Sequence, residues 1–428
     1  MSQKISVGVI GATGMVGQNY IRLLNDNPWF EVAYVAASPR SAGKRYREAV
    51  AGRWHMLTDM PRAVGDLVVE DAGNVGAALG KCSVIFSAVD MDKEAVRKLE
   101  MEYASKSFAV ISNNSAHRQT EDVPMLIAEV NHEHCDIIPA QQKHYGWTKG
   151  LIVVKPNCSI QSYMIPIHAL LQKGFRVERM IVTTLQGLSG AGYPGPSSLD
   201  MVDNIIPYIG GEEEKSENEP GKVLGKVVGN RIVPDESISI SAHCTRVPVI
   251  DGHSACISIE FAGAKPSAEE IKELWRSYRS VPQDLRLPSA PRRPIVVREE
   301  IDRPQPRKDR DTEKGMAVVV GRLRPCKVFD YRFVGLSHNT VRGAAGGAIL
   351  MAELLKVKGY IEGGKRVKDK GQRKKHRAKR KDDHRRQTAE RQKSQEARKL
   401  EGEKAQSSRD RSKEKGERKR EEGAGDTA

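Results

Sequence analysis

The first 157 residues alternate short apolar runs with segments of helix length. The apolar runs are rich in β-branched residues, and Met15–Leu24, which follows the first of them, has the spacing of an amphipathic helix. Such alternation is typical of a parallel, doubly wound α/β sheet. We therefore predict a Rossmann-like domain over residues 1–157, with strands at Ile5–Ile10, Val32–Ala36, Val84–Ser87, Phe108–Ile111 and Leu151–Val154.

The pattern changes in the middle of the chain, where longer segments alternate apolar and polar residues. Strands of this kind favour a mixed or antiparallel sheet with one face turned to solvent or to an interface. We therefore predict a second, α+β domain over residues 158–337. Its expected strands are Arg179–Gln186, Ser237–Thr245 and Ser254–Phe261, and its expected helices are Ile160–Leu171, Ser197–Ile206 and Ala268–Ser277.

A glycine-rich helix is expected at Thr340–Val357, and we predict that residues 338–357 complete the first domain. Glycines in its first turns would allow close approach to another backbone or to a ligand. Beyond Lys358 the chain loses its core-forming residues, and no aromatic residue follows Tyr360. Such a segment cannot bury enough apolar surface to offset the entropy of ordering, so we expect residues 362–428 to be disordered.

The basic charge is concentrated in this C-terminal segment. Of the formal net charge of +15, residues 358–428 contribute +12, from 26 Lys and Arg against 14 Asp and Glu. Residues 1–357 therefore carry only +3, as an ordinary globular body would. The tail is either a solvated charged extension or a weak binder of polyanions through their phosphates. It lacks the interleaved aromatic residues that specific single-strand recognition would need.

Cysteine usage points to a reducing compartment. The six cysteines are scattered and form no C-x-x-C pair, which disfavours a zinc site and a disulfide framework. The first strand begins near Ile5, which leaves no room for a signal or transit peptide. No apolar run approaches the roughly 20 residues that span a bilayer. We expect a soluble, cytoplasmic protein without a metal site or a membrane partner.

A glycine-rich loop follows the first predicted strand. It reads Gly11-Ala-Thr13-Gly14-Met-Val16-Gly17 and leads into the first predicted helix. Glycine lets a backbone approach a phosphate closely, and a helix N-terminus directs N–H groups towards it. We interpret this loop as a nucleotide site, the alternative being a plain tight turn between strand and helix.

The end of the second predicted strand indicates which nucleotide binds. NAD-dependent enzymes usually carry Asp or Glu there to hold the ribose 2′-hydroxyl. This chain instead has Ser38-Pro-Arg40-Ser41, and a guanidinium with two hydroxyls suits a 2′-phosphate. NADP is therefore the expected cofactor, the alternative being an ordinary polar turn.

Cys158 lies where a predicted strand ends and a predicted helix begins, in Pro156-Asn-Cys158-Ser. A thiol at a helix N-terminus faces unpaired N–H groups and the positive end of the helix dipole. Both favour the thiolate, which is the nucleophilic form. We therefore expect an activated cysteine that forms a thioester.

Several motifs follow one another in the order found in aspartate-semialdehyde dehydrogenases, and the chain resembles that family over about residues 1–357. The segments Ser38–Lys44 and Gly211–Lys215 look most like the archaeal and fungal branch. The motifs are Gly11–Gly17, Ser112–Arg118, Pro156–Ser159, the segment around Gln186, Gly211–Lys215, the pair Arg246 and His253, and Asn339–Gly347.

The resemblance implies reversible, NADP-dependent conversion of aspartyl 4-phosphate to aspartate semialdehyde and phosphate, through a thioester on Cys158. It also implies that residues 158–337 are the catalytic and dimerisation domain of a homodimer or homotetramer. His253, with an ordinary pKa of about 6.5, would be the acid/base, and Gln186 would orient the acyl group. The substrate would be bound by Asn114, Arg118, Glu212, Lys215 and Arg246, and the cofactor by Gly11, Thr13, Gly14, Val16, Ser38, Arg40, Ser41, Ser87 and Asn339.

Two of these residue assignments, and the identity of the substrate, have alternatives. Glu213 adjoins Glu212 and Asn113 adjoins Asn114, so either neighbour could take the role. An acyl-thioester reductase similar to malonyl-CoA reductase would suit the same cysteine, histidine and arginine. A third interpretation is a protein that has lost catalysis and binds nucleic acid through its tail, but the intact catalytic set weighs against it.

Overall fold

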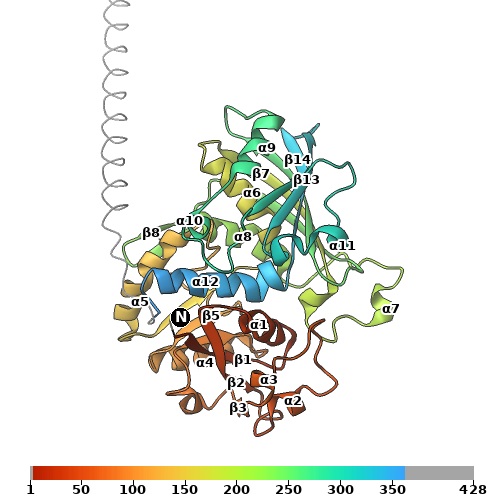
Figure 1. The fold of residues 1–428 in the computed structure, drawn as a ribbon. Helices are drawn as coiled ribbons and strands as arrows, with labels where there is room; N and C mark the ends of the chain where they lie inside the picture. The colour runs from red at the N-terminus through yellow and green to blue at the C-terminus, as the bar shows by residue number, and fades with distance from the viewer. Residues whose placement is uncertain (1–2, 362–428) are drawn as a thin grey trace, which may run out of the picture. The chain divides into compact units, whose positions relative to one another are not determined.

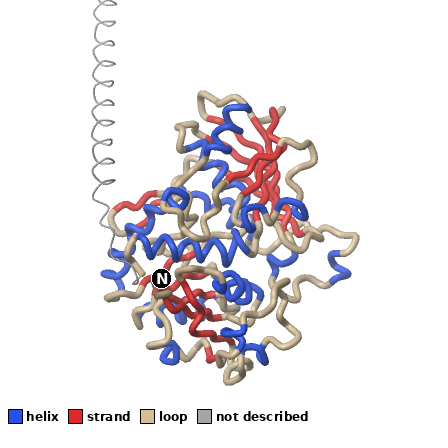
Figure 2. The backbone as a smooth tube through the Cα atoms, in the orientation of Figure 1, coloured by secondary structure: helices blue, strands red, loops and turns tan. Residues whose placement is uncertain are grey.

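Residues 3–361 are described by the computed structural model, and two six-stranded β-sheets run through them (Figures 1 and 2). Residues 362–428 lie outside the described part, so their expected disorder and polyanion binding stay predictions. No helix within residues 3–361 is both long enough and apolar enough to cross a membrane.

The first sheet is parallel throughout and has the strand order β3-β2-β1-β4-β5-β6. This is the order of a doubly wound nucleotide-binding sheet, so the predicted fold class is confirmed. Its strands agree with the predicted ones except for β3, whose three residues are too few to show a pattern. The strands are β1 (Ile5–Ile10), β2 (Phe30–Ala37), β3 (Val69–Asp71), β4 (Val84–Ser87), β5 (Ala109–Ser112) and β6 (Leu151–Val154).

Different helices cover the two faces of this sheet. Val84 and Phe86 of β4 belong to one hydrophobic cluster with α1 (Met15–Asn25) and α12 (Gly346–Val357). Ile85, which points to the opposite face, belongs to another cluster with α4. Both faces are therefore buried, as in other parallel sheets. The other helical elements of this region are α2 (Tyr46–Ala49), α3 (Arg62–Gly65), η1 (Val75–Ala78), α4 (Lys93–Ser105), η2 (His132–Ile137) and α5 (Ile138–Tyr145).

The second sheet is mixed and has the strand order β10-β7-β11-β14-β13-β12. β7 pairs with β10 in parallel and with β11 in antiparallel orientation, which confirms the predicted mixed sheet. The sequence pattern gives no prediction for β12 to β14, which are short or interrupted by Gly and Arg. The strands are β7 (Val177–Gln186), β10 (Ser239–Arg246), β11 (His253–Phe261), β12 (Ile295–Arg298), β13 (Val318–Pro325) and β14 (Tyr331–Ser337).

Two predicted helices pack on this second sheet (Figure 1). Trp275 of α9 is buried and donates a hydrogen bond from its ring N–H to the carbonyl oxygen of Pro166 in α6, at 3.0 Å. The elements of this region are η3 (Leu188–Ala191), α6 (Gln161–Leu171), α7 (Ser198–Met201), α8 (Glu212–Leu224), the hairpin β8 (Lys226–Val228) and β9 (Arg231–Val233), α9 (Ala268–Ser277), α10 (Val281–Asp284), α11 (Pro306–Asp309) and η4 (Thr312–Gly315).

The helix predicted at Ser197–Ile206 is wrong over most of its length, because only the four residues of α7 are helical. Asp203 has a φ of +60°, which an α-helix does not allow. Ile206 then forms a β-bridge with Arg246. The apolar periodicity of this segment is therefore not that of a packed helix.

The helix predicted at Thr340–Val357 is divided in two. The five residues of η5 (Val341–Ala345) form a π-helical turn, in which Ala344 has the non-helical dihedrals φ −138° and ψ −106°. α12 follows, contacts α1 and β5, and lies between the two sheets in Figure 1. The limits of the two domains, 1–157 with 338–357 and 158–337, stay predictions.

The close packing of α6 on the second sheet depends on Gly335 in β14. A Cβ at Gly335 would lie 2.1 Å from the carbonyl oxygen of Ser162 in α6, far inside van der Waals contact. We expect Gly335→Ala to lower the free energy of unfolding by about 1–3 kcal/mol, the usual cost of overpacking, in denaturant titrations. Gly76→Ala is the matched control, because its Cβ would meet only the Asn74 side chain at 3.5 Å. Equal losses of stability in the two variants would contradict this prediction.

Candidate active site

Cys158 lies in the turn between β6 and α6, at the carboxyl edge of the first sheet. Asn157 forms an Asx turn here, because its side-chain oxygen accepts the backbone N–H of Ser159 at 2.8 Å. The helix begins at Gln161, so the sulfur precedes the first helical turn instead of capping it. Ligands of doubly wound sheets bind at this edge, which makes the turn a suitable place for a nucleophile.

The expectation that the surroundings of Cys158 favour the thiolate is wrong. Burial and then the Glu212 carboxylate raise the pKa of the Cys158 thiol to about 12, although Arg118, Arg246 and Lys155 act in the opposite direction. The residue as a whole is partly exposed, so the burial concerns the sulfur. The sequence pattern indicates a nearby helix N-terminus, but it does not show how much water the sulfur loses on burial. This loss of water is the largest cause of the raised thiol pKa.

Three predicted site residues lie side by side on adjacent strands at one edge of the second sheet. Gln186 at the end of β7 pairs with Arg246 at the end of β10 and with His253 at the start of β11. Directly paired residues of neighbouring strands point to the same face, so the register alone brings the three side chains together. All three are buried. The sheet register therefore builds this part of the site from segments that are distant in sequence.

His253 is held in one tautomer. Its Nδ1 accepts a hydrogen bond from the backbone N–H of Gly187 at 3.0 Å, so the proton of the neutral ring resides on Nε2. Nε2 has no partner within residues 3–361. Burial and then the positive charge of Arg246 lower the pKa of His253 to about 4, so the expectation of an ordinary pKa is wrong. A Cβ at Gly190 would lie within 3.0 Å of both His253 Nε2 and Arg246 Nη1, which means that Gly190 keeps the space before them open.

Glu212 connects the two halves of the site. Its carboxylate accepts hydrogen bonds from Asn157 Nδ2 at 2.9 Å, Gln186 Nε2 at 3.1 Å and Lys215 Nζ at 2.8 Å. Burial alone would raise the pKa of Glu212, but Lys215 and these hydrogen bonds lower it. The competing residue Glu213 instead accepts the backbone N–H of Cys244 at 3.0 Å, so the structure brings only Glu212 to the other site residues.

Arg118 is paired with a residue that the sequence analysis missed. Its Nη1 donates to Glu219 Oε1 at 2.8 Å, and its Nε has no partner within residues 3–361. Glu219 also accepts the backbone N–H of Asn157 at 2.5 Å. Glu212 and Glu219 are seven residues apart in α8, a spacing that places them on one helix face, and this periodicity is the signal that could have identified Glu219.

Asn114 and Ser87 lie together at the carboxyl ends of the first sheet. Asn114 donates from Nδ2 to Ser87 Oγ at 3.1 Å and to Glu100 Oε1 at 3.0 Å. The amide N–H groups of Asn114 are thereby used, and its oxygen is the group left for a ligand. The neighbouring Asn113 uses its backbone oxygen to accept from Arg118 Nη2 at 3.3 Å.

Asn339 has partners at both ends of its side chain. Its oxygen accepts the backbone N–H of Gly252 at 2.7 Å, and its Nδ2 donates to Ser189 Oγ at 2.8 Å. Asn339 therefore connects η3 to the start of β11, and its Nδ2 carries a second N–H besides the one bonded to Ser189. Its assigned role stays a prediction.

The loop between β1 and α1 fits a nucleotide phosphate. Gly11 has a φ of +75°, and a Cβ there would lie 2.2 Å from the carbonyl oxygen of Ala88. The backbone conformation and close packing of the turn therefore require glycine at this position. A Cβ at Gly14 would meet only Gly11 O at 3.5 Å, which leaves room for a ligand. Gly14 is the N-cap residue of α1 and offers no side-chain cap, and no acidic residue occupies the first turn, where Val16 lies. The backbone N–H groups there can therefore bind an anion.

The turn after β2 is also consistent with a phosphate. The backbone N–H of Ser41 donates to Ser38 O at 2.9 Å, and Arg40 between them is exposed. Within residues 3–361 Arg40 forms no ion pair. No acidic residue stands at the end of β2, so the turn offers positive charge and hydroxyl groups without a carboxylate.

Two family descriptions match most of the described chain. Residues 6–138 match the semialdehyde dehydrogenase NAD binding domain, and residues 167–342 match the semialdehyde dehydrogenase dimerisation domain. The second of these matched regions contains Gln186, Glu212, Arg246 and His253, and the first contains the glycine-rich loop.

Several relatives that are named aspartate-semialdehyde dehydrogenase align with most of this chain. An aspartate-semialdehyde dehydrogenase of Aspergillus fumigatus is 46% identical over 364 residues, which cover 84% of this chain and 99% of the relative. The aspartate-semialdehyde dehydrogenase of Methanothermobacter thermautotrophicus is 44% identical over 353 residues, which cover 82% of this chain and 99% of the relative. The crystal structure of aspartate-semialdehyde dehydrogenase with NADP from Candida albicans is 40% identical, covers 83% of this chain and all of its own, and gives a TM-score of 0.76. The chain therefore belongs to the aspartate-semialdehyde dehydrogenase family.

Proposed function

We propose that the chain converts L-aspartyl 4-phosphate reversibly to L-aspartate 4-semialdehyde and phosphate with NADP as cofactor, a step of amino-acid biosynthesis. The single observation that carries the proposal is the position of Cys158 at the carboxyl edge of a nucleotide-binding sheet, within electrostatic range of Arg246 and Glu212. The relatives named above support the same reaction, because they align over almost their whole length.

Cys158 would be the nucleophile of this reaction. Its sulfur would attack the acyl carbon, the C–O bond to phosphate would break, and a thioester would remain. Bound NADPH supplies the hydride that brings the thioester to the aldehyde level. Since burial raises the pKa of the thiol and so favours its protonated form, acylation needs a group that accepts its proton.

Arg246 and Glu212 would bind the two charges of the amino-acid end of the substrate. Arg246 Nη1 donates to Gly187 O at 2.7 Å, which fixes the guanidinium and leaves its other N–H groups for the α-carboxylate. Glu212 carries the negative charge that a substrate ammonium requires. Gln186, bonded to Glu212, would then orient the acyl group.

Arg118 and Lys215 would bind the phosphate. Both are paired with carboxylates, those of Glu219 and Glu212, so the phosphate would join or replace these pairs. Asn114 lies close by but offers its amide oxygen, which suits a donor of the cofactor or substrate better than a phosphate.

His253 would act as a proton donor. Its proton is on Nε2, which is the unpartnered nitrogen, and this atom can stabilise an oxygen that becomes negative during reduction of the thioester. The same tautomer prevents Nε2 from accepting the proton of Cys158. The proposed role is therefore acid and hydrogen-bond donor, not base.

The cofactor would occupy the loop Gly11–Gly17 with its pyrophosphate and the turn Ser38–Ser41 with its 2′-phosphate, with Thr13 and Ser87 alongside. Within residues 3–361, no cluster of three His, Cys, Asp or Glu side chains could hold a metal ion. We infer a homodimer, which could pair further into a tetramer, because the chain contains a dimerisation domain. A cytoplasmic location is in keeping with its six free cysteines.

Replacement of the nucleophile tests the reaction. We expect Cys158→Ser to reduce NADP-linked, phosphate-dependent oxidation of aspartate semialdehyde by roughly a thousandfold or more, because a hydroxyl is a weaker nucleophile and a poorer leaving group. Cys256→Ser, which changes an exposed thiol outside the site, should keep full activity. Both variants are to be compared by steady-state kinetics and by circular dichroism.

Two results would contradict the proposal. Normal turnover by folded Cys158→Ser would exclude the thioester. A marked preference of the unaltered protein for an acyl-CoA over the acyl phosphate would assign it to the malonyl-CoA reductase type of enzyme.

Cofactor choice is tested at Arg40. We expect Arg40→Ala to raise the KM for NADPH about tenfold, since about 1.4 kcal/mol is a modest value for a hydrogen bond to a charged group. The KM for NADH should change little. Arg45→Ala is the matched control, because Arg45 is already paired with Asp66 at 3.3 Å. A preference of the unaltered protein for NADH would contradict the assignment.

A further inference from the structure

A buried carboxyl group holds the side chain of Asn114. Glu100 belongs to α4 and is fully buried, on the helix face that also carries Leu99 and Tyr103. Its Oε1 accepts hydrogen bonds from Ser112 Oγ at 2.7 Å and from Asn114 Nδ2 at 3.0 Å. Glu100 therefore places a polar group on the helix face that an amphipathic helix reserves for apolar side chains.

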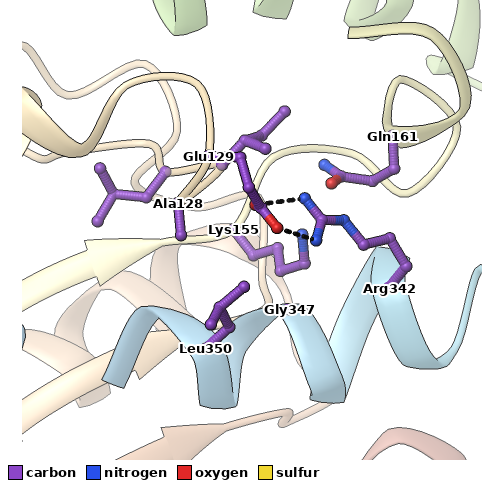
Figure 3. Close-up of a pocket in the computed structure, with 9 residues that line it drawn as sticks. Ala128, Glu129, Lys155, Gln161, Arg342, Gly347 and Leu350 are labelled. Carbon is purple, nitrogen blue, oxygen red and sulfur yellow. Dashed lines mark hydrogen bonds and ion pairs between the residues drawn. The ribbon is translucent and has the colours of Figure 1, made fainter. Parts of the chain in front are cut away.

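Glu100 differs from Glu129, another buried acid, because no cation is paired with it. Figure 3 shows Arg342 lying against both oxygens of Glu129, with N–O distances of 2.7 and 2.6 Å. Within residues 3–361 Glu100 forms no ion pair with Lys or Arg, and its Oε2 lies 3.8 Å from His117 Nε2 without a hydrogen bond. A buried carboxyl group with an unpartnered oxygen costs stability. The hydrogen bonds of Oε1 therefore explain this residue better than a stabilising role does.

These hydrogen bonds fix which way the Asn114 amide points. A carboxylate oxygen only accepts hydrogen bonds, so it selects the NH2 group of Asn114. Ser87 Oγ accepts from the same NH2 group at 3.1 Å, and Ser112 Oγ accepts the backbone N–H of Asn114 at 3.0 Å. Within residues 3–361 the side-chain oxygen of Asn114 forms no hydrogen bond, so it is left for a ligand.

This orientation does not depend on the charge of Glu100. Burial raises the pKa of Glu100, whereas its hydrogen bonds, that of Ser112 first, oppose the rise. Because Oε1 already accepts two hydrogen bonds, a bound proton would reside on Oε2, which has no partner. Oε1 therefore accepts from Asn114 in the ionised and in the protonated form.

Asn114 and Ser87 lie on the nicotinamide side of the predicted cofactor site. Ser87 ends β4 and Asn114 follows β5, whereas the loop Gly11–Gly17 follows β1. The strand order reverses between β1 and β4, and dinucleotides bind across a doubly wound sheet at this point. With the pyrophosphate on Gly11–Gly17, the nicotinamide nucleoside would extend over the ends of β4 and β5. Its hydroxyl and carboxamide groups are donors that an amide oxygen can accept.

We propose that Glu100 is a positioning residue, which holds Asn114 with its amide oxygen turned towards a hydrogen-bond donor of the nicotinamide nucleoside. The inference rests on the proposed function for the identity of the cofactor. Glu100 touches neither cofactor nor substrate and acts through Asn114. Loss of the acceptor at position 100 frees the amide to rotate, and an N–H group then faces the donor in place of the oxygen.

The proposal is tested by titrating the full-length protein with NADPH and following the nicotinamide fluorescence, which requires no turnover. We expect Glu100→Met, which removes the acceptor, to raise the Kd for NADPH about tenfold, or about 1.4 kcal/mol, the value of one hydrogen bond. Glu100→Gln keeps an acceptor oxygen and should change the Kd by no more than about twofold. Equal losses in the two variants would contradict the role of Oε1 as acceptor.

A double-mutant cycle shows whether the effect passes through Asn114. In an Asn114→Ala background, Glu100→Met should change the Kd by no more than about twofold, because the amide on which Glu100 acts is gone. A merely structural role of Glu100 would give the same loss in both backgrounds. Glu353→Met is the matched control and should leave the Kd unchanged, because Glu353 is also buried but is bonded by Asn27 and Ser289 outside the predicted site.

Unaltered NADPH binding by folded Glu100→Met, or additive losses in the cycle, would overturn the proposal. A raised KM for aspartate semialdehyde with an unchanged Kd for NADPH would overturn it too, since the Asn114 oxygen would then face the substrate. Should Glu100→Met fail to fold, Glu100→Leu takes its place in the same cycle. The expected NADPH titrations in a protein without dehydrogenase activity would refute the proposed reaction and keep the role of Glu100.

Discussion

The candidate site depends on one buried carboxylate, that of Glu212. It accepts hydrogen bonds from Asn157 in the turn that carries Cys158, from Gln186 at the edge of the second sheet and from Lys215 in the same helix. Segments far apart in the sequence thus converge on two oxygen atoms. Since a buried charge that loses its partners is strongly destabilising, these bonds fix how the nucleophile lies relative to the second sheet.

Burial also affects the protonation of three side chains at the site. Loss of water raises the pKa of Cys158 and lowers the pKa values of His253 and Lys155, so each of the three favours its uncharged form. The ion pairs Arg118–Glu219 and Arg342–Glu129 are satisfied within the protein.

Much of the fold and part of the site could be predicted from the sequence. The strands of the first sheet are buried β-branched runs, and Cys158 and the glycine-rich loop follow such runs directly. Prediction failed where local pattern and tertiary contact disagree. Residues 197–206 have helical spacing, but their end pairs with β10, and the strands β12 to β14 are recognisable only once their neighbours are present.

The sequence by itself determined most strands of the first sheet, the positions of Cys158 and the glycine-rich loop after two of them, and the resemblance to one enzyme family, because these depend on residues close together in the chain. Only the tertiary structure decided that Glu212 and not Glu213 reaches the site, that the Nδ1 atom of His253 accepts a hydrogen bond, and that burial raises the pKa of the Cys158 thiol. Each of these depends on hydration and on hydrogen bonds from distant segments. Such contacts exist only after the two sheets have packed, so no local sequence pattern can predict them.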